Sequence, residues 1–187
     1  MRWWLLLALL SGCLPTPAPS RGAEPAPALD GLDRQVHRSA NRARASAGRG
    51  PLRWSDDLAA VARAHSRDMA RRGYFDHVTP EGVTAHDRAR AGGVTCRKAV
   101  GGGRVLVGVA ENLYMSTRYA RVRVRTVGER TTRSPDWYPP GELARRTVAG
   151  WLGSPGHRRN LLDATSRSHG IGVATSGDRV LITQVLC

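Results

Sequence analysis

Lysine, aromatic residues and long apolar runs are scarce in this chain, and each scarcity argues against a class of function. Lys98 is the only lysine among the 187 residues, so the glycine run 101–103 lacks the lysine of a phosphate-binding loop. Aromatic residues make up 5% of the chain, which offers few platforms for stacking nucleic-acid bases. The one long apolar run, at the N-terminus, is too short to span a bilayer as a helix of the mature protein.

Acidic residues are also few relative to basic ones. The chain has 29 Lys and Arg against 15 Asp and Glu, which gives a formal net charge of +14. Such a charge attracts a protein to anionic surfaces of the cell envelope. The excess is almost wholly arginine in a chain rich in alanine and glycine, which a GC-rich coding bias also produces. A solvated basic surface without a particular partner is therefore an equal alternative.

The N-terminal segment has the features of an export signal. Arg2 is followed by a short apolar core, and small residues precede Cys13. Leu10-Ser11-Gly12-Cys13 resembles the lipobox of bacterial lipoproteins, in which the cysteine is lipidated and becomes the first mature residue. We expect residues 1–12 to be a lipoprotein signal peptide and Cys13 to carry the lipid. The alternative is an ordinary secretory signal with an incidental cysteine.

A proline-rich stretch follows the signal. Residues 14–28 contain five prolines with Ala, Ser and Thr, a composition that favours extended polyproline conformations and cannot bury a core. We expect residues 13–28 to be a tether and residues 29–187 to be one domain, long enough for a hydrophobic core.

Cysteine parity predicts a disulfide in that domain. Once Cys13 is lipidated, Cys96 and Cys187 remain as an even pair in an exported, oxidising compartment. Two unpaired thiols are the alternative, because the sequence does not show whether the two Cα atoms come close enough.

Apolar periodicity and capping residues predict the helices. We expect a helix from about residue 29 to 47, a second between Ser55 and Gly73, a short one from Thr84 to Arg90, and a third longer one over 142–153 that Pro155 stops. His65 falls on the apolar face of the second helix, so a core histidine is favoured there over a ligand.

Strand signals occupy the remainder of the domain. We expect a buried strand over 105–110, a strand with one wet, arginine-bearing face over 119–127, a turn-rich loop over 134–141, and a hairpin of 169–176 with 179–186. Helices and strands without βαβ alternation predict the α+β class.

Five short motifs occur in a fixed order: Ala64-His65-Ser66-Arg-Asp68-Met69-Ala70, Phe75-Asp-His77, Ala110-Glu111-Asn112, Trp151-Leu-Gly-Ser154-Pro-Gly-His157-Arg-Arg-Asn160-Leu, and Gly170-Ile-Gly172-Val. In this order they closely resemble the CAP superfamily of cysteine-rich secretory proteins, antigen 5 and pathogenesis-related proteins, in its bacterial SCP-like form. The resemblance implies an α-β-α sandwich with a mainly antiparallel central sheet.

The resemblance also implies a cleft with two histidines and two acidic residues in metal-binding members. The histidines match His77 and His157, and the first acid matches Glu111, but the second acidic position holds Ser154. Glu81 could replace the missing carboxylate. Two imidazoles and a carboxylate can hold zinc and activate water. The alternative is a hydrogen-bonded structural cluster that includes Asn112 and Asn160.

Other candidate sites are weaker. Residues 153–156 do not form the G-x-S-x-G motif of a nucleophile elbow, and no strand precedes them. His37, His86 and His169 show no convergent partners, and we expect them to be surface or capping residues.

These features favour a binding module over an enzyme. The expected function is that of an exported, lipid-anchored protein that binds or scaffolds a lipid, glycan or peptide of the cell envelope. The alternative is a metal-dependent hydrolase using the cleft of His77, Glu111 and His157. The expected partners are a membrane, through Cys13, and no nucleic acid, and the expected location is the periplasm or outer surface, or otherwise the medium. No feature of the sequence indicates an oligomeric state.

Overall fold

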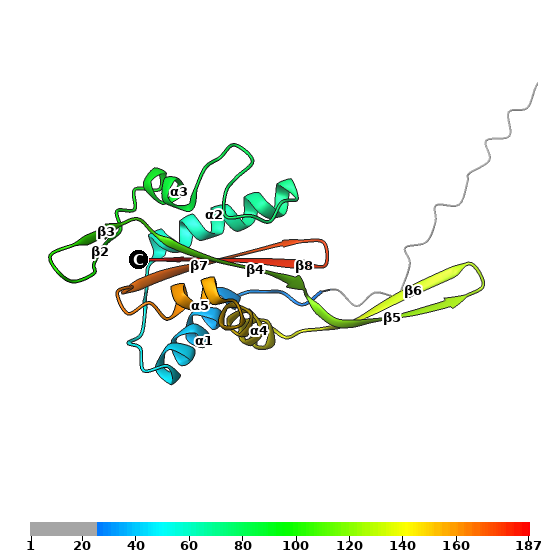
Figure 1. Ribbon diagram of the computed structural model, residues 1–187. Coiled ribbons are helices and arrows are strands. Elements are labelled where there is room, and N and C mark those ends of the chain that lie inside the picture. Colours follow the sequence, from blue (N-terminus) through cyan, green and yellow to red (C-terminus); the bar gives the residue numbers. More distant parts are fainter. Residues whose placement is uncertain (1–25) are drawn as a thin grey trace, which may run out of the picture.

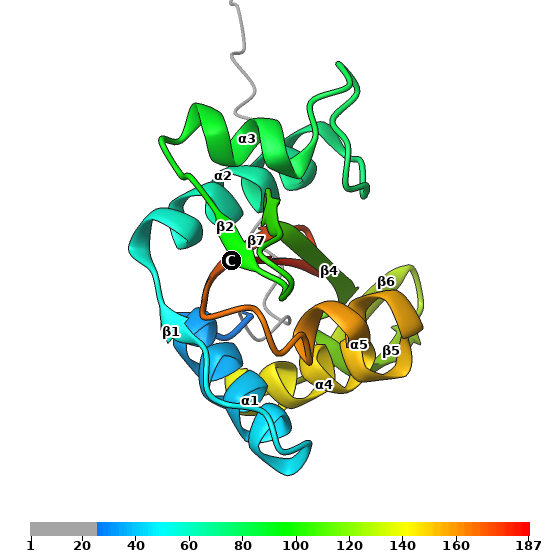
Figure 2. The same ribbon diagram turned by 60° about the vertical axis from the view of Figure 1, so that its left-hand side comes forward.

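A four-stranded sheet lies between two layers of helices in the computed structural model, which describes residues 26–187 (Figure 1, Figure 2). The strand order is β1 (Arg53–Trp54), β7 (Ser168–Ser176), β8 (Arg179–Leu186) and β4 (Ala110–Thr117). β1 pairs with β7 in parallel, and the other pairs are antiparallel. The predicted α+β class and mainly antiparallel sheet are confirmed. The predicted signal peptide, and Cys13 with it, lie outside the described residues.

The two helical layers differ in composition. One face of the sheet carries α1 (Leu32–Ser46), α4 (Pro140–Gly153) and α5 (Pro155–Leu161), while the other carries α2 (Asp56–Arg72) and α3 (Ala85–Ala91), as Figure 2 shows. The larger core cluster joins α1, α4 and the sheet around Trp151, which is fully buried. No helix within residues 26–187 is long and apolar enough to cross a bilayer.

Local capping explains where the helices near the site begin and end. The Ser55 hydroxyl accepts a bond from the Leu58 amide at 3.3 Å, and Gly73 ends α2 with a φ of 74°. Thr84 and Asp87 form a reciprocal capping box at the start of α3. These caps confirm the predicted limits of both helices. They fix the entry and exit of the loop that carries His77.

The buried strand expected over 105–110 is wrong. β3 (Val105–Val107) pairs with β2 (Arg97–Ala99) in a small hairpin, and its side chains are 44 to 62% exposed. The strand that enters the sheet is β4, all eight residues of which pair with β8. The glycines at 101–103, which take positive φ, turn the chain between β2 and β3, so residues 105–107 belong to that hairpin and only Ala110 of the expected strand lies in the sheet.

The arginine-rich strand exists, but its predicted buried face is wrong. β5 (Tyr119–Val127) pairs with β6 (Arg130–Trp137), which occupies part of the segment expected to be a turn-rich loop. This hairpin projects from the body (Figure 1), and Val124 is 61% exposed. Strict alternation predicts a strand but does not show whether another layer covers its apolar face.

The predicted disulfide between Cys96 and Cys187 is present, with Cα atoms 5.5 Å apart. It joins the segment before β2 to the residue after β8, across 91 positions. A loop of that length contributes about 4 to 5 kcal/mol in the chain-entropy model. The backbone of Cys187 is held further by Ser168, so the C-terminal end stays in the sheet.

Candidate functional site

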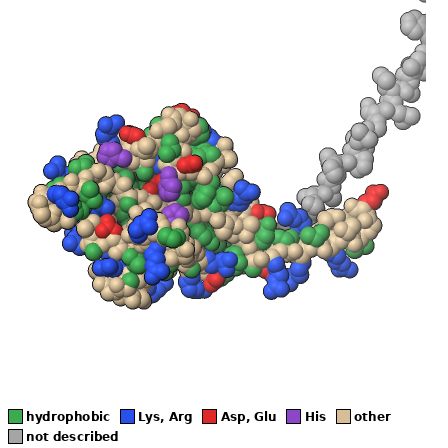
Figure 3. Space-filling model, in the orientation of Figure 1, with side chains coloured by type: hydrophobic (Ala, Val, Ile, Leu, Met, Phe, Trp, Pro, Cys, Tyr) green, Lys and Arg blue, Asp and Glu red, His purple; other side chains and the backbone are tan. Residues whose placement is uncertain are grey.

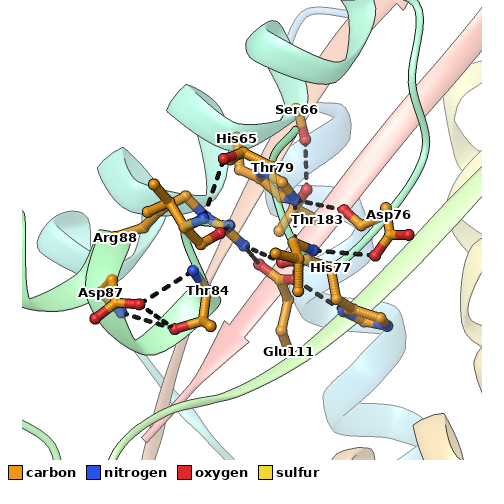
Figure 4. A network of polar contacts seen from close by, with 12 residues as sticks. His65, Ser66, Asp76, His77, Thr79, Thr84, Asp87, Arg88, Glu111 and Thr183 are labelled. Carbon is orange, nitrogen blue, oxygen red and sulfur yellow. Dashed lines mark hydrogen bonds and ion pairs between the residues drawn. The ribbon is translucent and has the colours of Figure 1, made fainter. Parts of the chain in front are cut away.

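The Glu111 carboxylate on β4 is the centre of a buried polar network (Figure 4). Its side chain is 3% exposed. One oxygen, Oε1, lies 2.9 Å from Nδ1 of His77, and the other, Oε2, lies 2.7 Å from Nη2 of Arg88. Nε2 of His65 is 3.9 Å from Oε1. Both carboxylate oxygens are therefore occupied by cationic or protonatable side chains.

Arg88 ties three segments together from α3. Its guanidinium donates to the Val83 carbonyl at 2.9 Å, to the His77 carbonyl at 3.1 Å and to Glu111. The side chain is only 11% exposed, and its Nε has no partner among the described residues. Arg88 thus holds the His77 loop against the sheet. No sequence motif marks Arg88.

His65 is buried within α2, as its place in the apolar stripe predicts. Its Nε2 donates to the Asp76 carbonyl at 3.0 Å, which fixes that tautomer. Its Nδ1 has no partner in the part of the chain that is described. A groove of about 710 Å³ runs between α2 and α3, and both His65 and Arg88 form part of its wall. The groove therefore borders the network around Glu111.

His157 lies in α5, which begins directly after α4 ends at Gly153. Pro155 follows the end of the predicted helix, as expected, and also occupies the first turn of α5. This places the His157 ring near that of His77, with centroids 5.9 Å apart. Ser154, at the second acidic position, lies between the two helices and makes no side-chain cap bond. The network thus contains a single carboxylate.

The protonation of the two facing histidines differs. The hydrogen bond that His77 donates to Glu111 raises the pKa of His77, while burial and then the charge of His77 lower the pKa of His157. His77 therefore tends to carry the proton, and His157 tends to be neutral.

The residues present do not fit a metal ion in this arrangement. A metal ligand must be deprotonated, whereas His77 is held toward its charged form and Arg88 occupies the second oxygen of Glu111. Across residues 26–187, no group of three or more His, Cys, Asp and Glu side chains is arranged to hold a metal. Zinc binding by His77, Glu111 and His157 therefore stays a prediction.

Glu81 lies elsewhere than the sequence suggested. Its side chain is 58% exposed and pairs with Arg72, whose Nη1 is 3.0 Å from Oε2. That bond lowers the pKa of Glu81 to about 2. Glu81 is thus engaged at the outer end of the loop, and the structure does not place it as the second acid.

A chain of buried side chains leads away from Glu111 across the molecule. Asn160 donates to Asn112 at 3.0 Å, Asn112 to Gln184 at 2.9 Å, and Gln184 to Nδ1 of His169 at 2.7 Å. With Nδ1 accepting, His169 carries its proton on Nε2 and donates to Nδ1 of His37, also at 2.7 Å. All four bonds run in one direction, from α5 through the sheet to α1.

The expectation that His37 and His169 are surface or capping residues is therefore wrong. His169 is fully buried, and His37 is its partner. They lie 132 positions apart and meet only because α1 packs on β7. The position of His169 just before Gly170-Ile-Gly172, on the innermost strand, was the one sequence signal for its burial. His86 is exposed, as expected.

Lowering the pH is expected to destabilise the protein through His169. Burial, followed by the charge of His37, lowers its pKa to about 3. Below the ordinary value of 6.5 the unfolded chain binds a proton that the folded chain does not, so the free energy of unfolding falls with pH. The loss from this residue is about 1.4 kcal/mol per pH unit below 6.5.

Urea unfolding between pH 7 and pH 4.5 tests this against His169→Gln, which can keep both hydrogen bonds without titrating. The variant should be less stable than the wild type at pH 7 but have a flatter pH profile. Parallel profiles would show that His169 does not control the acid sensitivity.

The sequence model described as "CAP: Cysteine-rich secretory protein family" matches residues 37–186. The chain belongs to this family. Two relatives in Bacillus subtilis strain 168 also match: the uncharacterized protein YkwD, 26% identical over 149 residues, and the uncharacterized membrane protein YlbC, 29% identical over 152 residues. The alignments cover 80% and 81% of this chain but 45% and 33% of those proteins. The chain therefore spans less than half the length of the relatives it matches.

Solved structures agree with this CAP fold. An extracellular protein containing an SCP domain from Bacillus anthracis is 26% identical, with a TM-score of 0.56 over 84% of this chain and 40% of that one. An outer surface protein from Borrelia burgdorferi has a TM-score of 0.59 over 85% of this chain and 93% of that one. At 14% identity, the second likeness concerns the fold alone.

Proposed function

We propose that this CAP-domain protein is exported, carries a lipid at Cys13, and binds or scaffolds a component of the cell envelope without catalysing a reaction. The extracellular SCP-domain protein of Bacillus anthracis, which is 26% identical, supports an extracytoplasmic location. The lipobox-like sequence that ends at Cys13 supports the anchor.

The observation that carries the non-catalytic assignment is the occupation of Glu111. Its buried carboxylate accepts bonds from both Arg88 and His77, so each oxygen already takes part in the contacts that hold the His77 loop. Ser154 supplies no second carboxylate. The second carboxylate of metal-binding members is therefore missing from this network.

The groove between α2 and α3 supports a binding role. Its wall is largely apolar, with Val61, Ala64 and Ala91 beside the more polar His65 and Arg88. The two unpartnered buried nitrogens of the network, His65 Nδ1 and Arg88 Nε, belong to these last two residues. A pocket that combines an apolar body with a few polar groups suits an amphipathic or partly anionic ligand.

Zinc titration near neutral pH separates the binding module from the metal-dependent hydrolase. We expect no stoichiometric zinc binding by the wild-type protein and none by His77→Ala/His157→Ala. The physical reason is that zinc must compete with the Arg88 guanidinium and with the proton of His77. Isothermal calorimetry measures this, with thermal unfolding as the check that the variant is folded.

Tight one-to-one binding that disappears in the folded variant would contradict the proposal. It would make the cleft a true metal centre and justify a search for hydrolase substrates. Weak binding of equal strength in both proteins would place zinc outside the cleft and leave the proposal intact.

A further inference from the structure

The projecting β5–β6 hairpin carries a strongly basic surface that neither the cleft nor the core uses. It contains five arginines, at positions 121, 123, 125, 130 and 133, against two carboxylates, Glu129 and Asp136. Figure 3 shows basic side chains gathered along one edge of the projecting arm. The hairpin is therefore cationic along most of its length.

Strand register places four of these arginines on one face. Arg123 pairs with Ser134, Arg125 with Thr132, and Val127 with Arg130. Paired residues in an antiparallel ladder share a face, and so do alternate residues along a strand. We call Arg121, Arg123, Arg125 and Arg130 the arginine face.

The charge of the arginine face is only partly compensated. Asp136 lies 2.9 Å from Arg121 and 3.0 Å from Arg123, so one carboxylate serves two guanidiniums. Arg125 and Arg130 form no ion pair with any residue between 26 and 187. Both are exposed, at the outer half of the hairpin. An external anion can therefore bind them without displacing an ion-pair partner within residues 26–187.

The hairpin gains little from its own folding. Two strands without a covering layer are marginally stable in water, and like charges side by side weaken them further. Val127, on the arginine face, is 63% exposed, and Val124, on the opposite face, is 61% exposed, which adds an apolar cost to the electrostatic one. A face that combines arginines with an exposed valine suits the headgroup region of a membrane, where both find partners.

The base of the hairpin lies beside the N-terminal end of the described chain. The Arg118 guanidinium, just before β5, donates a hydrogen bond to the Pro27 carbonyl and also lies 5.5 Å from the Trp137 ring centroid. About 13 residues separate Cys13 from Ala26, a span of at most about 45 Å when fully extended. A lipid on Cys13 would therefore keep the hairpin within reach of the membrane.

We propose that the arginine face docks on the anionic headgroups of a phospholipid membrane. The guanidiniums of Arg125 and Arg130 bind lipid phosphates by paired hydrogen bonds, and Val127 enters the interfacial layer. The surface is separate from the Glu111 network. Membrane docking by the arginine face requires neither the cleft nor the lipid anchor.

Vesicle flotation of residues 26–187 tests the proposal without the anchor, since this segment carries every described helix and strand and the disulfide. Vesicles of phosphatidylcholine alone are compared with vesicles that contain about 30% phosphatidylglycerol, at about 0.1 M salt. We expect binding to the anionic vesicles only, and weaker binding as salt increases. Arg125→Glu/Arg130→Glu should lower the affinity by about 30-fold or more.

A matched variant separates this surface from net charge. Arg38→Glu/Arg49→Glu makes the same change in charge at two exposed arginines of the α1 region and should bind within about threefold of the wild type. Arg125→Lys/Arg130→Lys, which keeps the charge but cannot make the paired hydrogen bonds, should lose some affinity but much less than the glutamate variant. Thermal unfolding checks that each variant is folded.

Three results would overturn the proposal. One is the absence of any preference for anionic vesicles. Another is an equal loss of affinity in the two charge-reversal variants. The third is binding to an immobilised anionic glycan that depends on Arg125 and Arg130 while anionic vesicles stay unbound, because that would assign the arginine face to a glycan.

Discussion

Replacing Gly172 with alanine is expected to destroy most of the stability of the fold. A Cβ atom at this position would lie 2.1 Å from the carbonyl carbon of Ala62 and 2.2 Å from the amide nitrogen of Arg63, both in the backbone of α2. Non-bonded contacts this short do not occur, and backbone atoms cannot turn aside as a flexible side chain can. Helix α2 would have to move away from β7 along its whole contact.

The loss in free energy of unfolding should exceed the roughly 1 to 3 kcal/mol that is usual for overpacking, because the displaced element is a whole helix. Such a loss is a large share of the total stability of a domain, which is about 5 to 15 kcal/mol. Gly170 is equally close, with its Cβ position 1.9 Å from the Ala59 amide nitrogen. A loss of about 1 kcal/mol shifts the melting temperature by about 2 to 8 °C. We therefore expect Gly172→Ala to lower the melting temperature by about 10 °C or more, or to make the protein insoluble.

Gly153→Ala is the matched control. No atom lies within 4 Å of a Cβ built at Gly153, and its φ is not in the left-handed region. Alanine should therefore be neutral there, or slightly stabilising at the end of α4. A Gly172→Ala protein that melts within about 2 °C of the control would show that α2 and β7 are less tightly packed than described.

Local signals account for the parts of the fold that the sequence predicted well. Ser55 and Thr84 cap α2 and α3. Each cap bonds a backbone amide within one turn of the chain, so the sequence alone predicts where the helix begins. The hairpin of β7 and β8 follows from alternation around Gly177 and Asp178 in the same way. Such features do not depend on what packs against them.

Burial is the property that local patterns could not supply. The apolar run 105–107 and the valines of β5 have the composition of buried strands, yet both lie in hairpins that no other layer covers. His169 shows the opposite error, because it becomes a fully buried residue, bonded to the partly buried His37, only when α1 packs on β7. In each case the deciding contact comes from a distant part of the chain.

The candidate site was predicted in part for a similar reason. Short motifs identified His77 and Glu111, which the structure brings to 2.9 Å, but the partner that determines their chemistry was missed. Arg88 was hidden because arginine is the commonest charged residue of this chain and no motif marks it. Arg88 matters because its side chain reaches from α3 to the buried carboxylate of Glu111.

Replacing Arg88 with methionine is expected to cost about 3 to 5 kcal/mol, the usual effect of leaving one partner of a buried ion pair alone. Methionine fills much of the same volume, so the loss is mainly that of the charge and three hydrogen bonds. Urea unfolding measures it. The double variant Arg88→Met/Glu111→Gln removes both charges. Its stability should therefore be about 1 to 3 kcal/mol higher than the sum of the two single effects predicts, and a coupling energy of about 1 kcal/mol is the smallest that would support a direct pair. Additive effects would contradict a direct pair.

The same variant decides why the cleft does not fit a metal. Two causes are present together: the missing second acid at Ser154, and the guanidinium on Oε2 of Glu111. If the guanidinium is the main cause, folded Arg88→Met should gain zinc affinity that Ser154→Asp does not, because only the first change leaves a free carboxylate oxygen beside His77. A gain in Ser154→Asp alone would instead make the missing acid decisive. In that case Arg88 would serve the structure of the loop without controlling the chemistry of the cleft.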